Sequence, residues 1–285
     1  MSKRNFLFFF TLVICSFSCS LLENELPIPF YIDLKSPSVR QPVANAFDTH
    51  KINEVWVFAD GQILGVFPLP AKVPVFFSGN SIEITILAGI RNNGMNETPV
   101  FYPFYKSIIA TINPKENEVI SIPLEFQYIA NAKIPVNESF EAGSCFTIDL
   151  DGKPEPYFDI SNQISSIGYK SAVITLTSSN RIMEIGCINK IKRGDNSRGQ
   201  SYVELDYKGE GEIAIGIAKN INNITRIEYV IYIPGKENWN KIYVDLTDKL
   251  SSSDYDEYFI VLGANKTGNS LESKIYIDNV KHLHF

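Results

Sequence analysis

The fold is decided most clearly by residues 54–67, which read EVWVFADGQILGVF. β-Branched and aromatic residues fill both halves of this stretch, and Asp60-Gly61 separates the halves. A two-residue Asp-Gly loop between two such runs is a strong hairpin signal, because both positions tolerate positive φ. The stretch therefore predicts two antiparallel strands that turn at Asp60-Gly61.

The same kind of pattern continues along the chain. Runs with period-two alternation recur at residues 82–86, 213–217 and 242–246, separated by clusters rich in Gly, Asn and Pro. Only residues 247–253 favour a short helical turn. Strands at this spacing indicate an all-β protein made of sandwiches. With 285 residues, of which 45% are hydrophobic, the chain is long enough for two domains.

We expect four segments along the chain. Residues 1–18 are predicted to be a signal peptide and residues 19–29 a tether. Residues 30–132 are predicted to form an N-terminal β-sandwich and residues 137–285 a C-terminal one. The boundary is placed near Ala130 to Asn137, because the strand-like run Ile120 to Tyr128 ends before it and Ile134-Pro135 leads into new material.

The first residues have the pattern of an export signal. Two basic residues precede the apolar segment 6–14, which is too short to cross a bilayer as a helix. Small residues follow, and Ser16 and Ser18 place Cys19 directly after a cleavage site. Cys15 fits this pattern less well, because Ile14 before it is bulky.

The end of this signal resembles the lipobox of bacterial lipoproteins, in the serine-rich form common in the Bacteroidetes. The resemblance implies diacylglycerol on the Cys19 thiol and cleavage just before it. Two or three acyl chains hold a protein stably at a bilayer. We therefore expect a lipid anchor in the outer membrane, on either the periplasmic or the surface side. The alternative is an ordinary secreted protein whose signal ends near a cysteine.

Two cysteines remain in the body of the chain, Cys145 and Cys187. The oxidising cell envelope permits a disulfide between them. In the chain-entropy model such a bridge would stabilise the fold by about 3–4 kcal/mol. The alternative is a pair of buried free thiols that pack as small hydrophobic groups.

Charge and motif content argue against several classes of function. The net charge of −6 disfavours nucleic acid as a partner. The sequence contains no nucleophile elbow, zinc-protease motif, P-loop or dinucleotide fingerprint. His282 and His284 share one face of the last predicted strand, where we expect an exposed strand end and not a metal site. These observations predict a protein that is not an enzyme.

The N-terminal hairpin, with the strand at residues 81–90, resembles the small β domains named for a Pro-Glu-Gly-Ala motif. The chain lacks the motif that gives those domains their name. The resemblance implies a surface spacer or adhesion module. Further strands up to residue 128 would complete a sandwich of immunoglobulin or transthyretin type.

The C-terminal half opens with Phe140-Glu141 and closes with Tyr276-Ile277-Asp278-Asn279-Val280. These bracketing motifs resemble the galactose-binding-like jelly rolls, which include many carbohydrate-binding modules. The resemblance implies a structural calcium held by Glu141 and Asp278, although calcium takes six to eight oxygens. The alternative is that both carboxylates cap strand ends or face solvent.

The resemblance also implies a sugar site with aromatic anchors, for which the candidates are Tyr157, Tyr169, Tyr207 and Trp239. The competing role for each is packing in the core. We expect the C-terminal domain to bind a glycan or similar ligand outside the cell. The alternative is an assembly subunit of an outer-membrane secretion, motility or nutrient-uptake complex that binds protein. Aromatics in a concave groove favour the first, and a flat apolar patch favours the second.

Overall fold

The structure is a computed structural model of the chain, and it describes residues 27–40, 49–95, 97, 99–153, 158–196, 199–222, 224–251 and 254–285. The signal peptide and Cys19 lie outside the described residues, so the lipid anchor stays a prediction. No helix within the described ranges is long and apolar enough to cross a bilayer.

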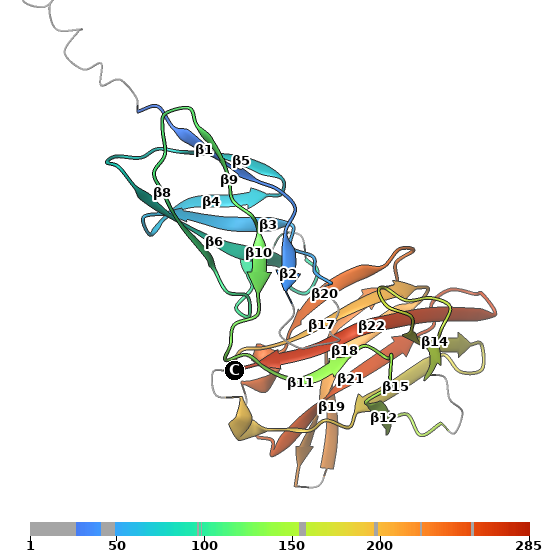
Figure 1. The fold of residues 1–285 in the computed structure, drawn as a ribbon. Helices are drawn as coiled ribbons and strands as arrows, with labels where there is room; N and C mark the ends of the chain where they lie inside the picture. Colours follow the sequence, from blue (N-terminus) through green and yellow to red (C-terminus); the bar gives the residue numbers. More distant parts are fainter. Residues whose placement is uncertain are drawn as a thin grey trace, which may run out of the picture.

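The all-β prediction is confirmed. The N-terminal half contains strands β1 (Phe30–Leu34), β2 (Ser38–Arg40), β3 (Glu54–Ala59), β4 (Gln62–Pro68), β5 (Ala71–Val75), β6 (Ile82–Arg91), β7 (Pro99–Phe101), β8 (Ile108–Ile112), β9 (Val119–Ser121) and β10 (Glu125–Gln127). Its largest sheet, sheet I, has the order β4-β3-β6-β7, and β8 also pairs with β6. The short sheets β5-β1-β9 and β10-β2 contribute the rest of the strand pairing in this half (Figure 1).

The predicted hairpin turn is present at Asp60-Gly61. The two residues have φ values of 46° and 76°, and they connect β3 directly to β4. Positive φ at both central positions is the conformation that a two-residue hairpin loop requires. Alternation on β3 and β6 sends Val55, Val57 and Ile84 into the core of this sandwich.

The C-terminal half contains strands β11 (Lys133–Glu138), β12 (Phe146–Asp149), β13 (Phe158–Ser161), β14 (Ser171–Thr177), β15 (Ile182–Cys187), β16 (Ile191–Lys192), β17 (Ser201–Gly209), β18 (Glu212–Ile221), β19 (Ile224–Pro234), β20 (Asn240–Asp245), β21 (Glu257–Asn265) and β22 (Glu272–His284). The helical turn expected near residue 247 is present as α2 (Thr247–Leu250), and a 3₁₀ turn spans Arg193–Asp195. Sheet II has the order β13-β14-β22-β17-β20, with β11 also on β22. Sheet III has the order β12-β15-β21-β18-β19, with β16 also on β21.

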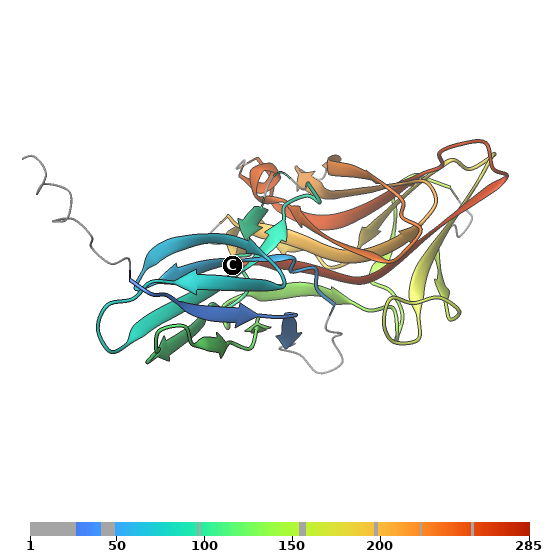
Figure 2. The same ribbon diagram turned by 90° about the horizontal axis from the view of Figure 1, so that it is seen from above.

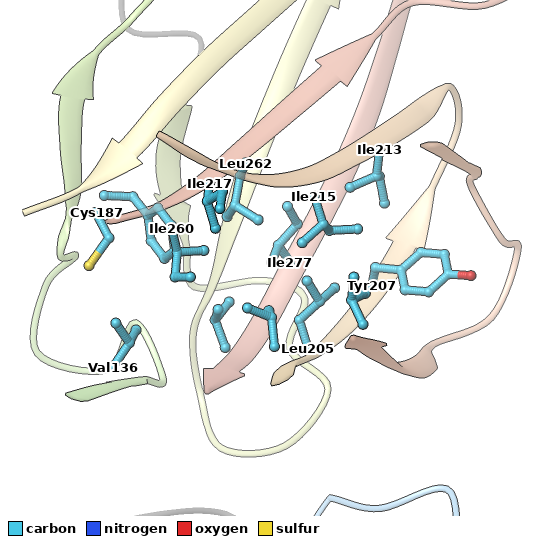
Figure 3. Close-up of a cluster of buried hydrophobic side chains, with 14 of the residues drawn as sticks. Val136, Cys187, Leu205, Tyr207, Ile213, Ile215, Ile217, Ile260, Leu262 and Ile277 are labelled. Atoms are coloured by element: carbon cyan, nitrogen blue, oxygen red, sulfur yellow. The ribbon is translucent and has the colours of Figure 1, made fainter. Parts of the chain in front are cut away.

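Sheets II and III enclose one hydrophobic core. Leu205 and Ile277 of sheet II lie across from Ile215, Ile260 and Leu262 of sheet III (Figure 3). All five side chains are fully buried. Ile215 comes from the period-two run at residues 213–217, where alternation correctly marks Ile213, Ile215 and Ile217 as inward-facing.

The two halves of the molecule are packed against each other (Figure 2). The N-terminal core takes in four side chains of the C-terminal half, which are Tyr202, Tyr243, Leu283 and Phe285. A parallel bridge joins Asn92 to Tyr243, and the Asn93 amide donates to the Tyr243 carbonyl at 2.9 Å. The predicted boundary overlaps strand β11 (Lys133–Glu138), which pairs with β22, so residues 133–136 belong to the C-terminal half.

Candidate binding face

The N-terminal half covers the outer face of sheet II at β17, β20 and the last part of β22. Glu204 on β17 is fully buried and accepts hydrogen bonds from the hydroxyls of Tyr102 (2.7 Å) and Tyr128 (3.0 Å). Lys241 on the neighbouring strand lies 3.3 Å from the same carboxylate. Lys281 on β22 lies over the Tyr128 ring at 5.6 Å from its centroid. Because each charge has a partner, this face is stable as a contact inside the molecule.

The outer face of sheet III carries a different set of residues. The strand register places Ile148, Gly186, Val261, Gly216 and Tyr229 in one row across β12, β15, β21, β18 and β19. Residues directly opposite each other on neighbouring strands share a face of the sheet. In this row Gly186 and Gly216 flank Val261, and Tyr229 lies at the end.

The next row along the same face contains Glu184, Gly263, Ala214 and Tyr232. Tyr229 and Tyr232 are three residues apart, a spacing that places side chains on opposite faces of a regular strand. The β18–β19 ladder shifts register between Ile215 and Gly216, so that Val230 is left over. This bulge brings both tyrosines to the outer face, and their ring centroids are 5.2 Å apart.

The Tyr229 ring lies flat along the sheet. A Cβ atom added at Gly216 would be 3.0 Å from the Tyr229 ring, and one added at Gly263 would be 2.8 Å from its hydroxyl. The hydroxyl donates to Glu184 Oε1 at 2.6 Å. Glu184 is on β15, on the same face of sheet III and three strands across from β19. Glycines within a strand leave room for this close approach. Ala218, Phe259 and Val261 form a second, smaller apolar cluster, and Tyr229 packs against it.

This arrangement suits the recognition of a flat, partly apolar molecule with hydroxyl groups. Tyr232 is 52% exposed and offers a ring face beside Tyr229. Burial raises the pKa of both tyrosines, and the Tyr229 hydroxyl donates its one proton to Glu184. The Asp151 carboxylate accepts from the Glu184 amide at 3.2 Å, which places a second acceptor near the rings. We call Glu184, Tyr229 and Tyr232 the tyrosine face.

The structure places the four predicted aromatic anchors in different environments. Tyr207 is 3% exposed and is part of the core between the two sheets, so its prediction as a stacking residue is wrong (Figure 3). Tyr169 is 82% exposed on the connection before β14. Trp239 is half-buried immediately before β20. Tyr157 lies outside the described residues. None of the three described anchors is on the tyrosine face.

Glu141 and Asp278, the predicted calcium ligands, both bind one backbone segment. Glu141 Oε1 accepts from the Tyr169 and Lys170 amides at 2.7 and 3.0 Å. Asp278 Oδ2 accepts from the Ser166 amide at 2.9 Å, and burial raises the pKa of Asp278 to about 7. In the part of the chain described here, no three His, Cys, Asp or Glu side chains gather as a metal site. Calcium binding by Glu141 and Asp278 stays a prediction.

Cys145 and Cys187 are brought together, as the disulfide prediction requires. Their sulfurs are 2.6 Å apart, both cysteines are unbridged, and Cys187 is buried. The hydrogen bond between the two thiols, together with burial, raises the pKa of Cys145. Whether the pair is oxidised in the cell stays a prediction.

The expectation that His282 and His284 lie at an exposed strand end is wrong. Their exposed fractions are 0% and 2%. The last strand is central in sheet II, because β11 and β17 pair with it as far as His284. The His282 Nε2 atom is 2.9 Å from Ser201 Oγ and 3.2 Å from the Tyr258 hydroxyl. Burial lowers the pKa of His282 to about 3, so the ring is neutral.

No known family model matches the chain, and no curated protein is similar to it in sequence. Among solved structures, it is similar to a carbohydrate-binding module of the β-sandwich superfamily, at 15% identity and a TM-score of 0.35 over 81% of this chain and 84% of that one. A family 30 carbohydrate-binding module from a Clostridium thermocellum cellulase also has 15% identity and a TM-score of 0.35, over 53% and 93% of the chains. A family 61 module in complex with β-1,4-galactotriose has 10% identity and a TM-score of 0.35, over 52% and 94%. At these identities and scores, no ligand can be transferred to this chain.

Proposed function

We propose that this protein is a non-catalytic binding protein of the cell envelope, and that its tyrosine face binds a glycan. The observation that carries the proposal is the outer face of sheet III, where a bulge places two tyrosines side by side over glycine positions. Sugar rings present apolar C–H faces edged by hydroxyls. A flat aromatic ring beside carboxylate acceptors complements both features.

The surroundings of the tyrosine face favour it as the binding site over the outer face of sheet II. The outer side of sheet II is occupied by Tyr102 and Tyr128 from the N-terminal half. Tyr232 on sheet III is more than half exposed. A ligand can therefore reach sheet III without separating the two halves of the protein.

The test is a glycan array probed with the full chain, followed by titration calorimetry with each glycan that binds. Tyr232→Ala is expected to weaken binding about 30-fold, because a central aromatic anchor contributes about 2 kcal/mol. Tyr169→Ala is the matched control, since it removes an exposed tyrosine on the connection between β13 and β14, two strands of sheet II. The proposal fails if no glycan binds, or if both substitutions have the same effect.

We further propose that the chain is exported and held at the outer membrane by lipid on Cys19. The support is the sequence of the leader alone. Intact-mass measurement on protein from cells of the source organism should show cleavage before Cys19 and two or three acyl chains. A product that keeps Met1 to Ser18 would contradict it. Protease shaving of whole cells distinguishes the surface from the periplasmic face.

The calcium prediction is tested separately by melting the protein with calcium and with a chelator. A bound ion stabilises the folded state in proportion to the logarithm of its concentration over its Kd. If calcium is bound at Glu141 and Asp278, the chelator should lower the melting temperature, and Asp278→Asn should remove that sensitivity. An unchanged melting temperature would contradict calcium binding and indicate that the two carboxylates bind only backbone amides.

A further inference from the structure

A lysine and two carboxylates are enclosed together on the outer face of sheet II, beneath the N-terminal half. The side chains of Lys241, Glu204 and Asp206 are 3%, 0% and 4% exposed. Lys241 Nζ lies 3.3 Å from Glu204 Oε2 and 3.8 Å from Asp206 Oδ1. Taking such charges out of water is costly, and their mutual attraction often fails to offset the cost. A reaction that removes one charge of each sign is therefore favoured at this position.

The strand pairing keeps one carboxyl group beside the lysine. Asp206 on β17 and Lys241 on β20 are directly opposite each other in the antiparallel ladder. Residues in this relation have Cβ atoms about 4.5–5.5 Å apart, and their side chains share one face of the sheet. Reacting groups that are held close together gain a very large effective concentration. The two strands thus present an amine and a carboxyl group to each other for as long as the protein is folded.

The two oxygens of Asp206 have different surroundings. Oδ2 accepts hydrogen bonds from Ser166 Oγ and Asn279 Nδ2, each at 3.0 Å. Donors placed on a carboxyl oxygen stabilise the negative charge that develops there when the carbon is attacked. Within the described part of the chain, no hydrogen bond holds Oδ1, which faces Lys241. Asp206 is therefore arranged as an electrophile, with one oxygen held and the other able to leave.

Glu204 is arranged differently, as a proton acceptor. Its Oε1 accepts from the hydroxyls of Tyr102 and Tyr128, and the Tyr128 hydroxyl is also 3.0 Å from Oε2. Both oxygens of Glu204 are thus held in place, in contrast to Oδ1 of Asp206. Oε2 is close to hydrogen-bond reach of Lys241 Nζ, where a general base has to be.

We propose that Lys241 and Asp206 form an isopeptide bond that joins β17 to β20. Glu204 accepts a proton from the Lys241 ammonium, and the free amine attacks Cγ of Asp206. The bond from Nζ to Cγ forms, the bond from Cγ to Oδ1 breaks, and Oδ1 leaves as water with two protons that came from Nζ. Glu204 relays these protons and ends unchanged. One ammonium and one carboxylate become one neutral amide, so atoms and charge balance without an oxidant, a reductant or a cofactor.

The surroundings of the lysine favour the product over its hydrolysis. Tyr102, Tyr128 and Tyr243 are buried around the site, and the Tyr243 ring centroid is 5.8 Å from Lys241 Nζ. A closed site of this kind excludes the water that would otherwise reverse the reaction. Attack requires the reacting atoms to be about 3–3.5 Å apart. The lysine side chain therefore has to shift slightly from Thr49, to which Nζ donates at 3.1 Å before the reaction.

The experiment is intact-mass measurement on the purified full chain, compared with Lys241→Arg prepared in the same way. After correction for the substitution, the wild-type chain should be lighter by one water, because processing at the N-terminus is the same in both. Lys219→Arg is the matched control, since it changes another lysine that is 3% exposed and lies 3.3 Å from a carboxylate, that of Glu228. This control should keep the loss of water. Asp206→Ala and Glu204→Gln should each abolish it.

Fragmentation of proteolytic peptides then locates the bond. The wild-type protein should give one branched peptide in which the Lys241 side chain is joined to Asp206. A wild-type chain that has not lost water, a bond at Glu204, or a loss that survives Lys241→Arg would each overturn the proposal. The decisive measurement is made on the wild-type protein, so it holds even where a variant does not fold.

Discussion

The two outer faces of the jelly roll contrast sharply in composition and in cover. Sheet II presents Glu204, Lys241 and Lys281, and all three are buried against the N-terminal half. Sheet III presents glycine, alanine and two tyrosines, and Tyr232 is exposed there. The closed face thus carries charged residues paired within the molecule, and the open face carries two tyrosines beside Glu184. A surface is free to bind when its side chains lack partners within the molecule, and this matters more here than whether the side chains are polar.

The largest expected difference between the faces comes from removing one glutamate from each. Glu204→Ala leaves the buried Lys241 without its closest carboxylate and should destabilise the protein by about 3–5 kcal/mol. Glu184→Ala removes only the acceptor of the half-buried Tyr229 hydroxyl and should cost about 1 kcal/mol or less. Denaturant unfolding measures both. Equal losses would show that the two faces do not differ in this way.

The next prediction concerns the cysteine pair at the edge of sheet III, where β12 pairs with β15. If Cys145 and Cys187 are bridged after export, reduction should lower the free energy of unfolding by about 3–4 kcal/mol. The double variant Cys145→Ser/Cys187→Ser should be insensitive to reductant. Free labelling of both thiols in protein prepared from the periplasm would contradict the bridge.

The next prediction concerns His282, on the inner face of sheet II, and the pH dependence of the free energy of unfolding. The pKa of His282 falls from 6.5 to about 3 on folding, because the ring is buried beside Tyr258 and His284. Below pH 6.5 the unfolded chain binds a proton that the folded chain does not. The contribution of His282 to stability is therefore full above pH 6.5 and falls as the pH decreases toward 3, by about 2 kcal/mol at pH 5.

The variant His282→Gln should make the unfolding free energy less dependent on pH in this range. His50→Gln, which changes a histidine in the connection before β3, is the control and should keep the wild-type slope. Identical slopes for all three proteins would show that another group controls acid stability.

The smallest expected effect separates two tyrosine hydroxyls. Tyr128→Phe removes a buried donor to Glu204 and should destabilise the protein by about 1–2 kcal/mol. Tyr232→Phe removes a hydroxyl from an exposed ring and should change the unfolding free energy by less than about 0.5 kcal/mol. Thermal melts of both variants are sufficient. A large loss for Tyr232→Phe would mean that the tyrosine face is structural.

The sequence predicted the strands well and the candidate site poorly, for a physical reason. Hairpin chemistry at Asp60-Gly61 is local, so it could be read directly from the residues. The tyrosine face depends on one unpaired residue, Val230, and no side chain in β19 marks the bulge. The glycines at 186, 216 and 263 were the available signal, because a glycine within a strand indicates a close approach.

The misplaced residues show the same limit. Tyr207 and His282 were assigned by residue type and position in the chain, whereas their burial depends on which strands flank them. Sequence alternation identifies an inward-facing position but not the neighbours of a strand. Pairing between distant strands decided both cases.

The bridge between Asn92 and Tyr243 has a consequence for how this protein can be divided. Strand β20 is the last strand of sheet II, and the end of β6 supplies its otherwise missing neighbour. A bare sheet edge readily recruits strands from other molecules and promotes aggregation. Cutting the chain between β10 and β11 would uncover that edge together with the apolar rings of Tyr202 and Phe285. The N-terminal half therefore shields the end of β20 and these rings, and we expect the C-terminal half expressed alone to aggregate.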